Sequence, residues 1–231
     1  MQAYVSIDLE TTGLNPKTDK IIEVGAVKVI EGKRTEVFSS FVNPGRKLDE
    51  KIAELTGIRD EDLRQAPSIE QVLPRVVDFL GELPLLGHSV LFDFSFLKKA
   101  AVNLGIPFEK QAMDTLKISR KYLDGLEHRN LEYLCEYYGI PHQAHRALAD
   151  ARATADLYDC LRERFFSEEE ALFQPRPLLY KAKKDSPATE FQKQRLYRLA
   201  GQHKISLELE VEMLTKSEAS RLIDRILAGK L

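Results

Sequence analysis

Residues 3–13 read Ala-Tyr-Val-Ser-Ile-Asp-Leu-Glu-Thr-Thr-Gly, and this stretch decides how the first part of the chain folds. Apolar and polar side chains alternate along residues 3–9, and in a β-strand successive side chains point to opposite sides. The apolar set is Val5, Ile7 and Leu9, and the polar set is Ser6, Asp8 and Glu10. Such alternation predicts a β-strand with one face packed against a core.

Asp8 and Glu10 are two residues apart, so their carboxylates project from the same face of the predicted strand. Like charges that lie close together repel, and both carboxylates stay ionised only where cations lie between them. Hard divalent ions with oxygen ligands, such as Mg²⁺ and Mn²⁺, meet that need. Taken alone, the pair fits a solvent-facing strand end at least as well, because short acidic patterns are common.

The sequence that follows predicts further strands and then helices. Residues 21–30 and 35–42 are rich in apolar and β-branched side chains, and Glu31-Gly32-Lys33 between them suits a hairpin. We therefore expect an antiparallel meander of three strands. Periodicity and capping patterns then predict helices at 69–80, 92–104, 130–138 and 146–166, and short strands at 83–87 and 111–115. This order indicates an α/β fold, with a mixed sheet flanked by helices.

The length of 231 residues suits one substantial domain and a small second unit. We assign residues 1–166 to the first domain. Residues 167–187 contain an acidic run, three prolines and a lysine cluster, which are typical of a linker. Residues 188–231 are expected to form a small, mainly helical unit. Within it, the strict alternation of residues 205–213 predicts a weak strand between two helices.

The composition is typical of a globular protein, with 43% hydrophobic residues and a net charge of −2. No apolar run approaches the ~20 residues that span a bilayer, and no basic leader precedes an apolar segment, so we expect no membrane partner and no secretion. Cys135 and Cys160 are expected to be reduced thiols in a cytoplasmic protein. Residues 175–204 carry eight Lys and Arg against two Asp and Glu, which fits either a phosphate-backbone contact or a solvated surface.

Two later segments combine an aspartate with a histidine. Residues 88–93, His-Ser-Val-Leu-Phe-Asp, place Asp93 at a helix start, where aspartate also serves as an N-cap. Residues 145–150, His-Arg-Ala-Leu-Ala-Asp, open the long helix, where Asp150 could instead pair with the arginine four residues earlier. Five helical residues rotate through about 500°, so His145 approaches Asp150 only if it reaches in from the preceding loop.

These three acidic segments, in this order and at these separations, resemble the motifs of the DEDDh (DnaQ-like) family of 3′→5′ exonucleases. The family includes the proofreading exonuclease of bacterial replicative polymerases. The resemblance covers about residues 1–166. Arg146 stands where a sister class has tyrosine. Ser89 departs from the family pattern, which commonly has asparagine at this position.

The resemblance implies an RNase H-like fold and a two-metal phosphodiester hydrolase. Two divalent cations, Mg²⁺ or Mn²⁺, would be held by four catalytic carboxylates, those of Asp8, Glu10, Asp93 and Asp150, with Asp93 acting through water. His145 would be the catalytic base. Contacts to the terminal nucleotide would come from Thr12, Leu14, His88 and Phe92. No role is assigned to His128, His142 or His203.

The resulting hypothesis is an exonuclease that releases nucleoside 5′-monophosphates from single-stranded DNA ends, in proofreading, replication or repair. Trimming of RNA 3′ ends stays open, because the catalytic motifs do not reveal contacts to the 2′-OH. A non-catalytic nucleic-acid or polymerase adaptor is a further alternative, although no carboxylate of the set is missing. Residues 188–231 could bind nucleic acid or dock a DNA polymerase or another replication protein.

Overall fold

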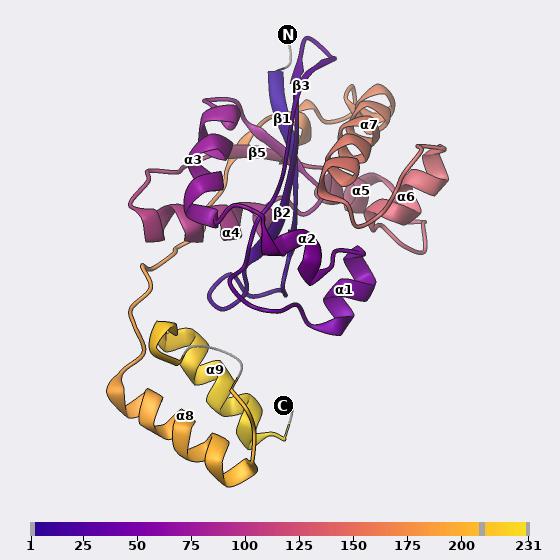
Figure 1. Cartoon of the computed structure of the whole chain (residues 1–231). Coiled ribbons are helices and arrows are strands. Elements are labelled where there is room, and N and C mark those ends of the chain that lie inside the picture. Colours follow the sequence, from indigo (N-terminus) through magenta and orange to yellow (C-terminus); the bar gives the residue numbers. More distant parts are fainter. Residues whose placement is uncertain (1–2, 208–210, 230–231) are drawn as a thin grey trace.

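A six-stranded mixed sheet lies at the centre of the computed structural model, which describes residues 3–207 and 211–229 (Figure 1). The strands are β1 (Ala3–Thr11), β2 (Ile21–Ile30), β3 (Lys33–Phe41), β4 (Leu85–Gly87), β5 (Gln111–Asp114) and β6 (Arg176–Pro177). Their order is β3-β2-β1-β4-β5-β6. β1, β4 and β5 run parallel to one another. β2 is antiparallel to β1, β3 is antiparallel to β2, and β6 is antiparallel to β5. The predicted opening meander and the α/β class are confirmed.

Helices cover both faces of the sheet (Figure 1). They are α1 (Glu50–Thr56), α2 (Asp60–Arg64), α3 (Ile69–Leu80), α4 (Leu91–Leu104), α5 (Thr115–Tyr122), α6 (Leu131–Tyr138) and α7 (Ala147–Phe165). α3 and α4 share one apolar cluster with the sheet, whereas α5, α6 and α7 share another. The sequence predicted α3, α4, α6 and α7. It did not predict α1, α2 and α5, which are short helices of seven, five and eight residues.

Both faces of β1 are packed over much of its length, so the prediction of a single packed face is wrong. The apolar set packs in the cluster that α3 and α4 share with the sheet, but Tyr4 lies in the cluster that includes α7. Ser6 is fully buried and donates its hydroxyl proton to the carbonyl of Ala151 in α7, at 2.7 Å. A strand between two helical layers buries both faces. The polar face becomes partly accessible only at Asp8 and Glu10.

A glycine in β2 allows α7 to approach the sheet backbone. Gly25 pairs with Asp8 across the β1–β2 ladder. An added Cβ at Gly25 would lie 2.1 Å from backbone atoms of Ala147 and Leu148. No side chain fits in that space, so the start of α7 lies directly over β2. This contact brings Asp150, in the first turn of α7, close to the strand that carries Asp8.

Residues 167–187, which the sequence predicted as a linker, contact the first part of the chain at several points. The 3₁₀-helix η1 (Glu170–Phe173) buries the ring of Phe173. β6 then pairs with β5 as an edge strand. Further along, Asp185 accepts a hydrogen bond from the ammonium group of Lys99 in α4, at 2.6 Å. The segment therefore runs along the sheet and α4 before it reaches the C-terminal unit (Figure 1).

The C-terminal unit consists of α8 (Glu190–His203) and α9 (Lys216–Leu227), with the 3₁₀-helix η2 (Val211–Met213) between them. These elements share a separate apolar cluster. The strand predicted over residues 205–213 is wrong where the structure describes it: residues 205–207 have no regular structure, and η2 follows. Residues 208–210 lie outside the described residues. Within the described part of this unit no strand is available for pairing, so alternation alone does not produce a sheet.

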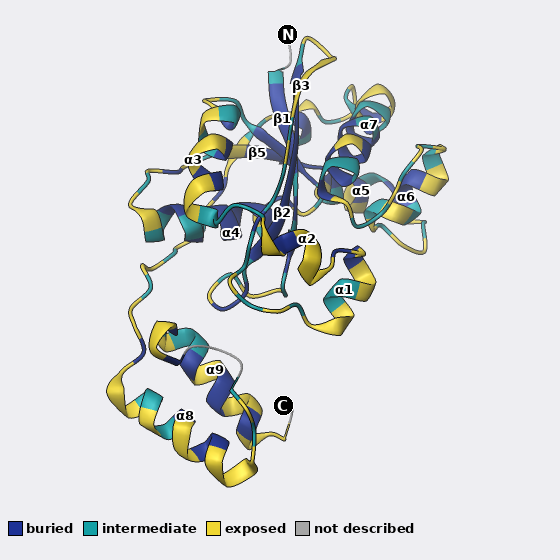
Figure 2. Cartoon of the chain, viewed as in Figure 1, coloured by how far each residue is buried: buried dark blue, intermediate teal, exposed yellow. Residues whose placement is uncertain are grey.

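Burial follows the sheet and the inner faces of the helices (Figure 2). The amphipathic helix α3 buries its apolar stripe, which consists of Val72, Leu73, Val76 and Leu80. In α8, by contrast, the outward face is exposed (Figure 2). Among the described residues, none of the helices has the length and apolar character that a membrane crossing requires.

We predict that Gly25→Ala lowers the free energy of unfolding by at least about 2 kcal/mol, because the new methyl group overlaps the backbone of α7. Urea unfolding followed by circular dichroism measures this change. The matched control is Gly201→Ala in α8, where an added Cβ meets no atom within 4 Å. That variant should be more stable by up to about 1 kcal/mol, because alanine favours helix. Wild-type stability of Gly25→Ala would contradict the close approach of α7.

Candidate active site

Three carboxylates meet where β1 passes the start of α7. Asp8 and Glu10 lie on β1, and Asp150 lies in the first turn of α7. One oxygen of each carboxylate lies within 4.8 Å of the others. Three oxygen donors at this separation can ligate a hard divalent cation together.

Asp93 approaches the same part of β1 from the first turn of α4. Its side chain is buried, and one carboxylate oxygen accepts a hydrogen bond from the N–H of Leu9 at 3.0 Å. Leu9 lies between Asp8 and Glu10 in the sequence. The bond therefore fixes α4 against the segment that carries both of these acids. Whether Asp93 also contacts a cation through water stays a prediction.

Burial and mutual repulsion raise the pKa values of these acids. Burial is the largest cause of the pKa of Asp8 lying well above its usual range, and repulsion from Asp93, Asp150 and Glu10 adds to it. Burial likewise raises the pKa of Glu10 to about 8, with repulsion from Asp150 and Glu23 as further causes. Carboxylates bind metal ions in their ionised form, so bound cations would displace these protons. The donor set therefore fits divalent cations chemically.

Two histidines precede α7, at positions 142 and 145. His145 is half-buried and has a left-handed backbone, with φ of 62°. No hydrogen bond of its side chain to another described residue is found. Nε2 of His142 instead forms a hydrogen bond with Oδ1 of Asp150. The sequence reasoning missed His142, because its separation of eight residues from Asp150 includes a loop whose path periodicity does not predict.

Glu23 is a fifth carboxylate beside the site, and the sequence reasoning also missed it. It pairs with Glu10 across the β1–β2 ladder and is 2% exposed. Its oxygens accept hydrogen bonds from the guanidinium of Arg146 at 3.0 Å and from the N–H of Ala147 at 3.2 Å. Arg146 therefore pairs through its side chain with Glu23, while its backbone N–H donates to Asp150. The sequence signal that could have indicated Glu23 is its acidic side chain within the mainly apolar run of residues 21–30.

Thr12 and Leu14, predicted to contact a nucleotide, lie in the loop after β1. The hydroxyl oxygen of Thr12 accepts hydrogen bonds from the N–H of Lys20 at 2.9 Å and from Arg46 at 2.5 Å. Leu14 is 84% exposed, so its side chain is available for contact. Both residues follow directly from the strand that carries Asp8 and Glu10.

His88 and Phe92, the other two predicted nucleotide contacts, lie on either side of the start of α4. Both ring nitrogens of His88 have partners within the protein, Thr115 Oγ1 at 2.9 Å and the Arg129 carbonyl at 2.8 Å. Burial lowers its pKa. Phe92 is half-buried and packs against another ring of α4. Ser89 has φ of 74°, a left-handed conformation that asparagine adopts more readily than serine.

The sequence profile of the RNase T-type exonuclease family matches residues 5–158, and the chain belongs to this family. The matched range includes the three clustered carboxylates together with Asp93 and both histidines before α7. The family resemblance inferred from the three acidic segments is confirmed.

The relatives include DNA polymerase III proteins. The chain is 40% identical over 157 residues to the PolC-type DNA polymerase III of Caldanaerobacter subterraneus subsp. tengcongensis. The aligned region covers 67% of the chain and 11% of the relative. It is 38% identical over 157 residues to the DNA polymerase III subunit epsilon of Aquifex aeolicus, covering 67% of the chain and 78% of that subunit. The chain thus spans only about a tenth of the length of its PolC-type relatives.

Product-bound exonuclease I has the same fold, with a TM-score of 0.67 at 19% sequence identity. The similarity covers 75% of this chain and 46% of exonuclease I. The RNase H-like mixed sheet flanked by helices, expected from the resemblance, is confirmed.

We predict that the metal-free protein becomes less stable as pH rises from about 5 to about 8. The folded-state pKa of Glu10 is raised from 4.5 to about 8. Between these values the folded protein holds a proton that the unfolded chain has released, so the free energy of unfolding falls with rising pH. The raised pKa values of Asp8 and Asp93 act in the same direction. Urea unfolding in EDTA at several pH values measures the slope.

Glu10→Gln should make this slope shallower, whereas Glu136→Gln, at an exposed position on α6, should leave it unchanged. Mn²⁺ should stabilise the wild-type protein more at pH 8 than at pH 5.5, because it competes with fewer protons. A stability that rises with pH in EDTA, with the same slope in Glu10→Gln, would rule out this account of the site.

Proposed function

We propose that the chain is a metal-dependent 3′→5′ exonuclease that releases nucleoside 5′-monophosphates from single-stranded DNA ends. The observation that carries the proposal is the meeting of Asp8, Glu10 and Asp150, whose oxygens lie within 4.8 Å of one another. Membership of the exonuclease family supports phosphodiester hydrolysis. A non-catalytic adaptor is not favoured, because every carboxylate of the family motifs is present.

In this proposal Asp8, Glu10 and Asp150 hold two divalent cations, Mg²⁺ or Mn²⁺, and Asp93 contributes through water. When bound, such cations stabilise charge on the phosphate and the leaving oxygen and lower the pKa of a nearby water. The protein itself fixes the positions of the acids. The Asp93–Leu9 hydrogen bond holds α4 against β1, and Gly25 lets α7 lie close enough to present Asp150.

His145 is the proposed general base that accepts the proton of the attacking water. An imidazole with a reference pKa of ~6.5 suits this role near neutral pH. Its half-buried position in the loop before α7 supports the assignment. His142 is a second candidate, because its Nε2 contacts a carboxylate oxygen of Asp150. A histidine bound to a metal ligand can instead orient that ligand, so the two residues are expected to differ in function.

The proposed substrate is DNA, because the relatives described above are DNA polymerase III proteins. Thr12, Leu14, His88 and Phe92 would contact the terminal nucleotide, and the exposure of Leu14 supports a wedge against its base. We further propose a cytoplasmic role in replication or repair. Residues 188–231 would then contact a DNA polymerase, another replication protein or the nucleic acid.

Asp8→Ala should lower the rate of mononucleotide release on the order of a thousandfold or more, because lost charge stabilisation of several kcal/mol corresponds to that factor. The assay follows single-stranded DNA labelled at its 5′ end with saturating Mg²⁺ or Mn²⁺, together with RNA of the same sequence. The wild-type protein should shorten the DNA stepwise from its 3′ end. Preferred shortening of the RNA would reassign the substrate, and full activity of a folded Asp8→Ala variant would refute the metal site.

His145→Ala should lower kcat by about 10²- to 10⁴-fold, the usual contribution of a general base, and change the Kd for Mn²⁺ less than about twofold. His142→Ala should mainly weaken Mn²⁺ binding, because it removes a partner of Asp150. Steady-state kinetics and isothermal titration calorimetry separate the two effects. The reverse pattern would assign the base to His142.

A further inference from the structure

The loop that follows β1, residues 12–20, is organised around one buried carboxylate. The side chain of Asp19 is 2% exposed and accepts a backbone N–H from within the loop at 2.9 Å. An added Cβ on Gly13 would lie 2.6 Å from the same carboxylate. The loop is therefore closely packed around Asp19. Under the proposed function, it carries the nucleotide contacts Thr12 and Leu14.

Two guanidinium groups from distant parts of the chain pair with Asp19. Arg46 lies 3.2 Å from Oδ1 and also donates to the hydroxyl of Thr12 at 2.5 Å. Arg221 of α9 lies 2.5 Å from the same carboxylate oxygen and donates to the hydroxyl of Thr18 at 2.5 Å. A carboxylate buried this deeply needs charged partners, because an unpaired charge in such surroundings is costly.

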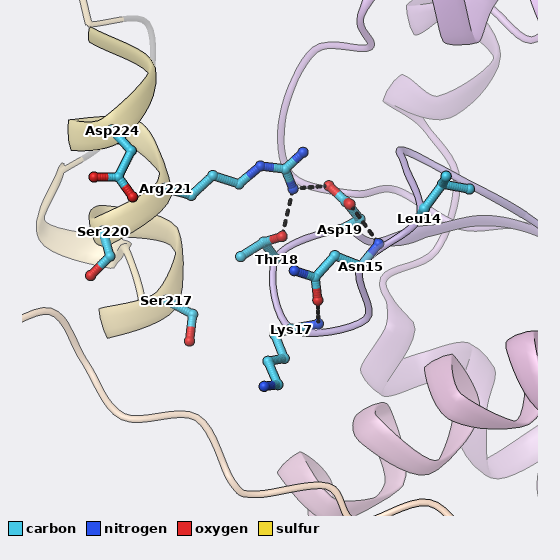
Figure 3. A pocket seen from close by; sticks show the side chains of 9 residues that line it. All are labelled: Leu14, Asn15, Lys17, Thr18, Asp19, Ser217, Ser220, Arg221 and Asp224. Atoms are coloured by element: carbon cyan, nitrogen blue, oxygen red, sulfur yellow. Dashed lines mark hydrogen bonds and ion pairs between the residues drawn. The ribbon is translucent and has the colours of Figure 1, made fainter. Parts of the chain in front are cut away.

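Arg221 belongs to the C-terminal unit, so this contact joins that unit to the loop (Figure 3). A second ion pair lies nearby, with Nζ of Lys20 2.8 Å from Oε1 of Glu218 in α9. An open cleft of about 630 Å³ lies between the loop and α9, and Leu14 is on its lining. α9 thus holds the loop at Asp19 and Lys20 and leaves the side chain of Leu14 exposed.

We propose that α9 positions the nucleotide-contacting loop, with Arg221 as its principal positioning residue. This inference rests on the proposed function, because it takes Thr12 and Leu14 as contacts of the terminal nucleotide. Arg221 pairs with Asp19, and Asp19 accepts the N–H of Asn15 in the loop. The shared partner Arg46 extends the network to the Thr12 hydroxyl. The described hydrogen bonds of Arg221 go to the loop and not to the metal-ligating carboxylates, so its effect falls on substrate binding.

The test compares Arg221→Ala, Arg221→Lys and wild type in the full chain. Arg221→Ala should raise KM for single-stranded DNA roughly tenfold, the factor expected when one charge-assisted contact is lost, and leave kcat within about twofold. The Kd for thymidine 5′-monophosphate with Mg²⁺ should rise by a similar factor. Arg221→Lys should recover part of both losses, because it restores the charge without the planar fork. Arg64→Ala, at an exposed position on α2 and outside both the loop and the C-terminal unit, is the matched control and should resemble wild type.

Hydrogen exchange of the loop amides provides a readout that is independent of turnover. Amides of residues 12–20 should exchange faster in Arg221→Ala than in wild type, while those of β2 and α3 keep their protection. Unchanged KM, unchanged nucleotide Kd and unchanged loop exchange in Arg221→Ala would overturn the inference. If Arg221→Ala does not fold, Glu218→Gln is tested instead, because it removes the ion pair with Lys20. This variant should raise KM and speed amide exchange in the loop. If it changes neither, the inference fails.

The two proposals fail in different ways. A wild-type protein that releases no mononucleotide would refute the proposed function, whatever the loop exchange shows. An active wild-type protein whose KM, nucleotide Kd and loop exchange do not respond to Arg221 would refute only the positioning role of α9.

Discussion

The burial of three mutually repelling carboxylates, those of Asp8, Glu10 and Asp150, is the constraint on which the arrangement of the sheet and its flanking helices depends. Their oxygens lie within 4.8 Å of one another in surroundings that already disfavour charge. Burial raises the pKa of Glu10 to about 8, so the metal-free site retains protons at neutral pH. Ionisation of such a cluster lowers the free energy of unfolding, so neighbouring elements must hold the acids in place. The same repulsion makes the site a strong attractor for divalent cations.

The supports come from elements far apart in the sequence. Gly25 has no side chain to keep α7 away, and Glu23 caps the start of that helix through the N–H of Ala147. Asp93 ties α4 to the backbone of Leu9, between two of the acids. The two hydrogen bonds and the close contact between β2 and α7 fix both the distance and the orientation of α4 and α7 relative to the sheet. The cluster is therefore held by the sheet and two helices together.

The sequence predicted those parts of the fold and site that follow from local patterns. Alternation around Asp8 and Glu10 was sufficient for the central strand and for the shared face of its acids. Contacts across the chain were not predictable in this way. The pairing of Glu23 with Arg146 and the approach of His142 to Asp150 depend on the path of a loop, and periodicity carries no information on that path. In residues 205–207 and 211–213, where the structure describes this segment, the alternating pattern was misleading, because a strand forms only where a partner strand is present.

The most direct test of the metal site is anomalous diffraction from crystals grown or soaked with Mn²⁺. The account predicts anomalous peaks bounded by the carboxylate oxygens of Asp8, Glu10 and Asp150, and a loss of these peaks in crystals of Asp8→Ala. Saturating Mn²⁺ with no peak at this cluster, in crystals of a protein that hydrolyses DNA, would contradict it.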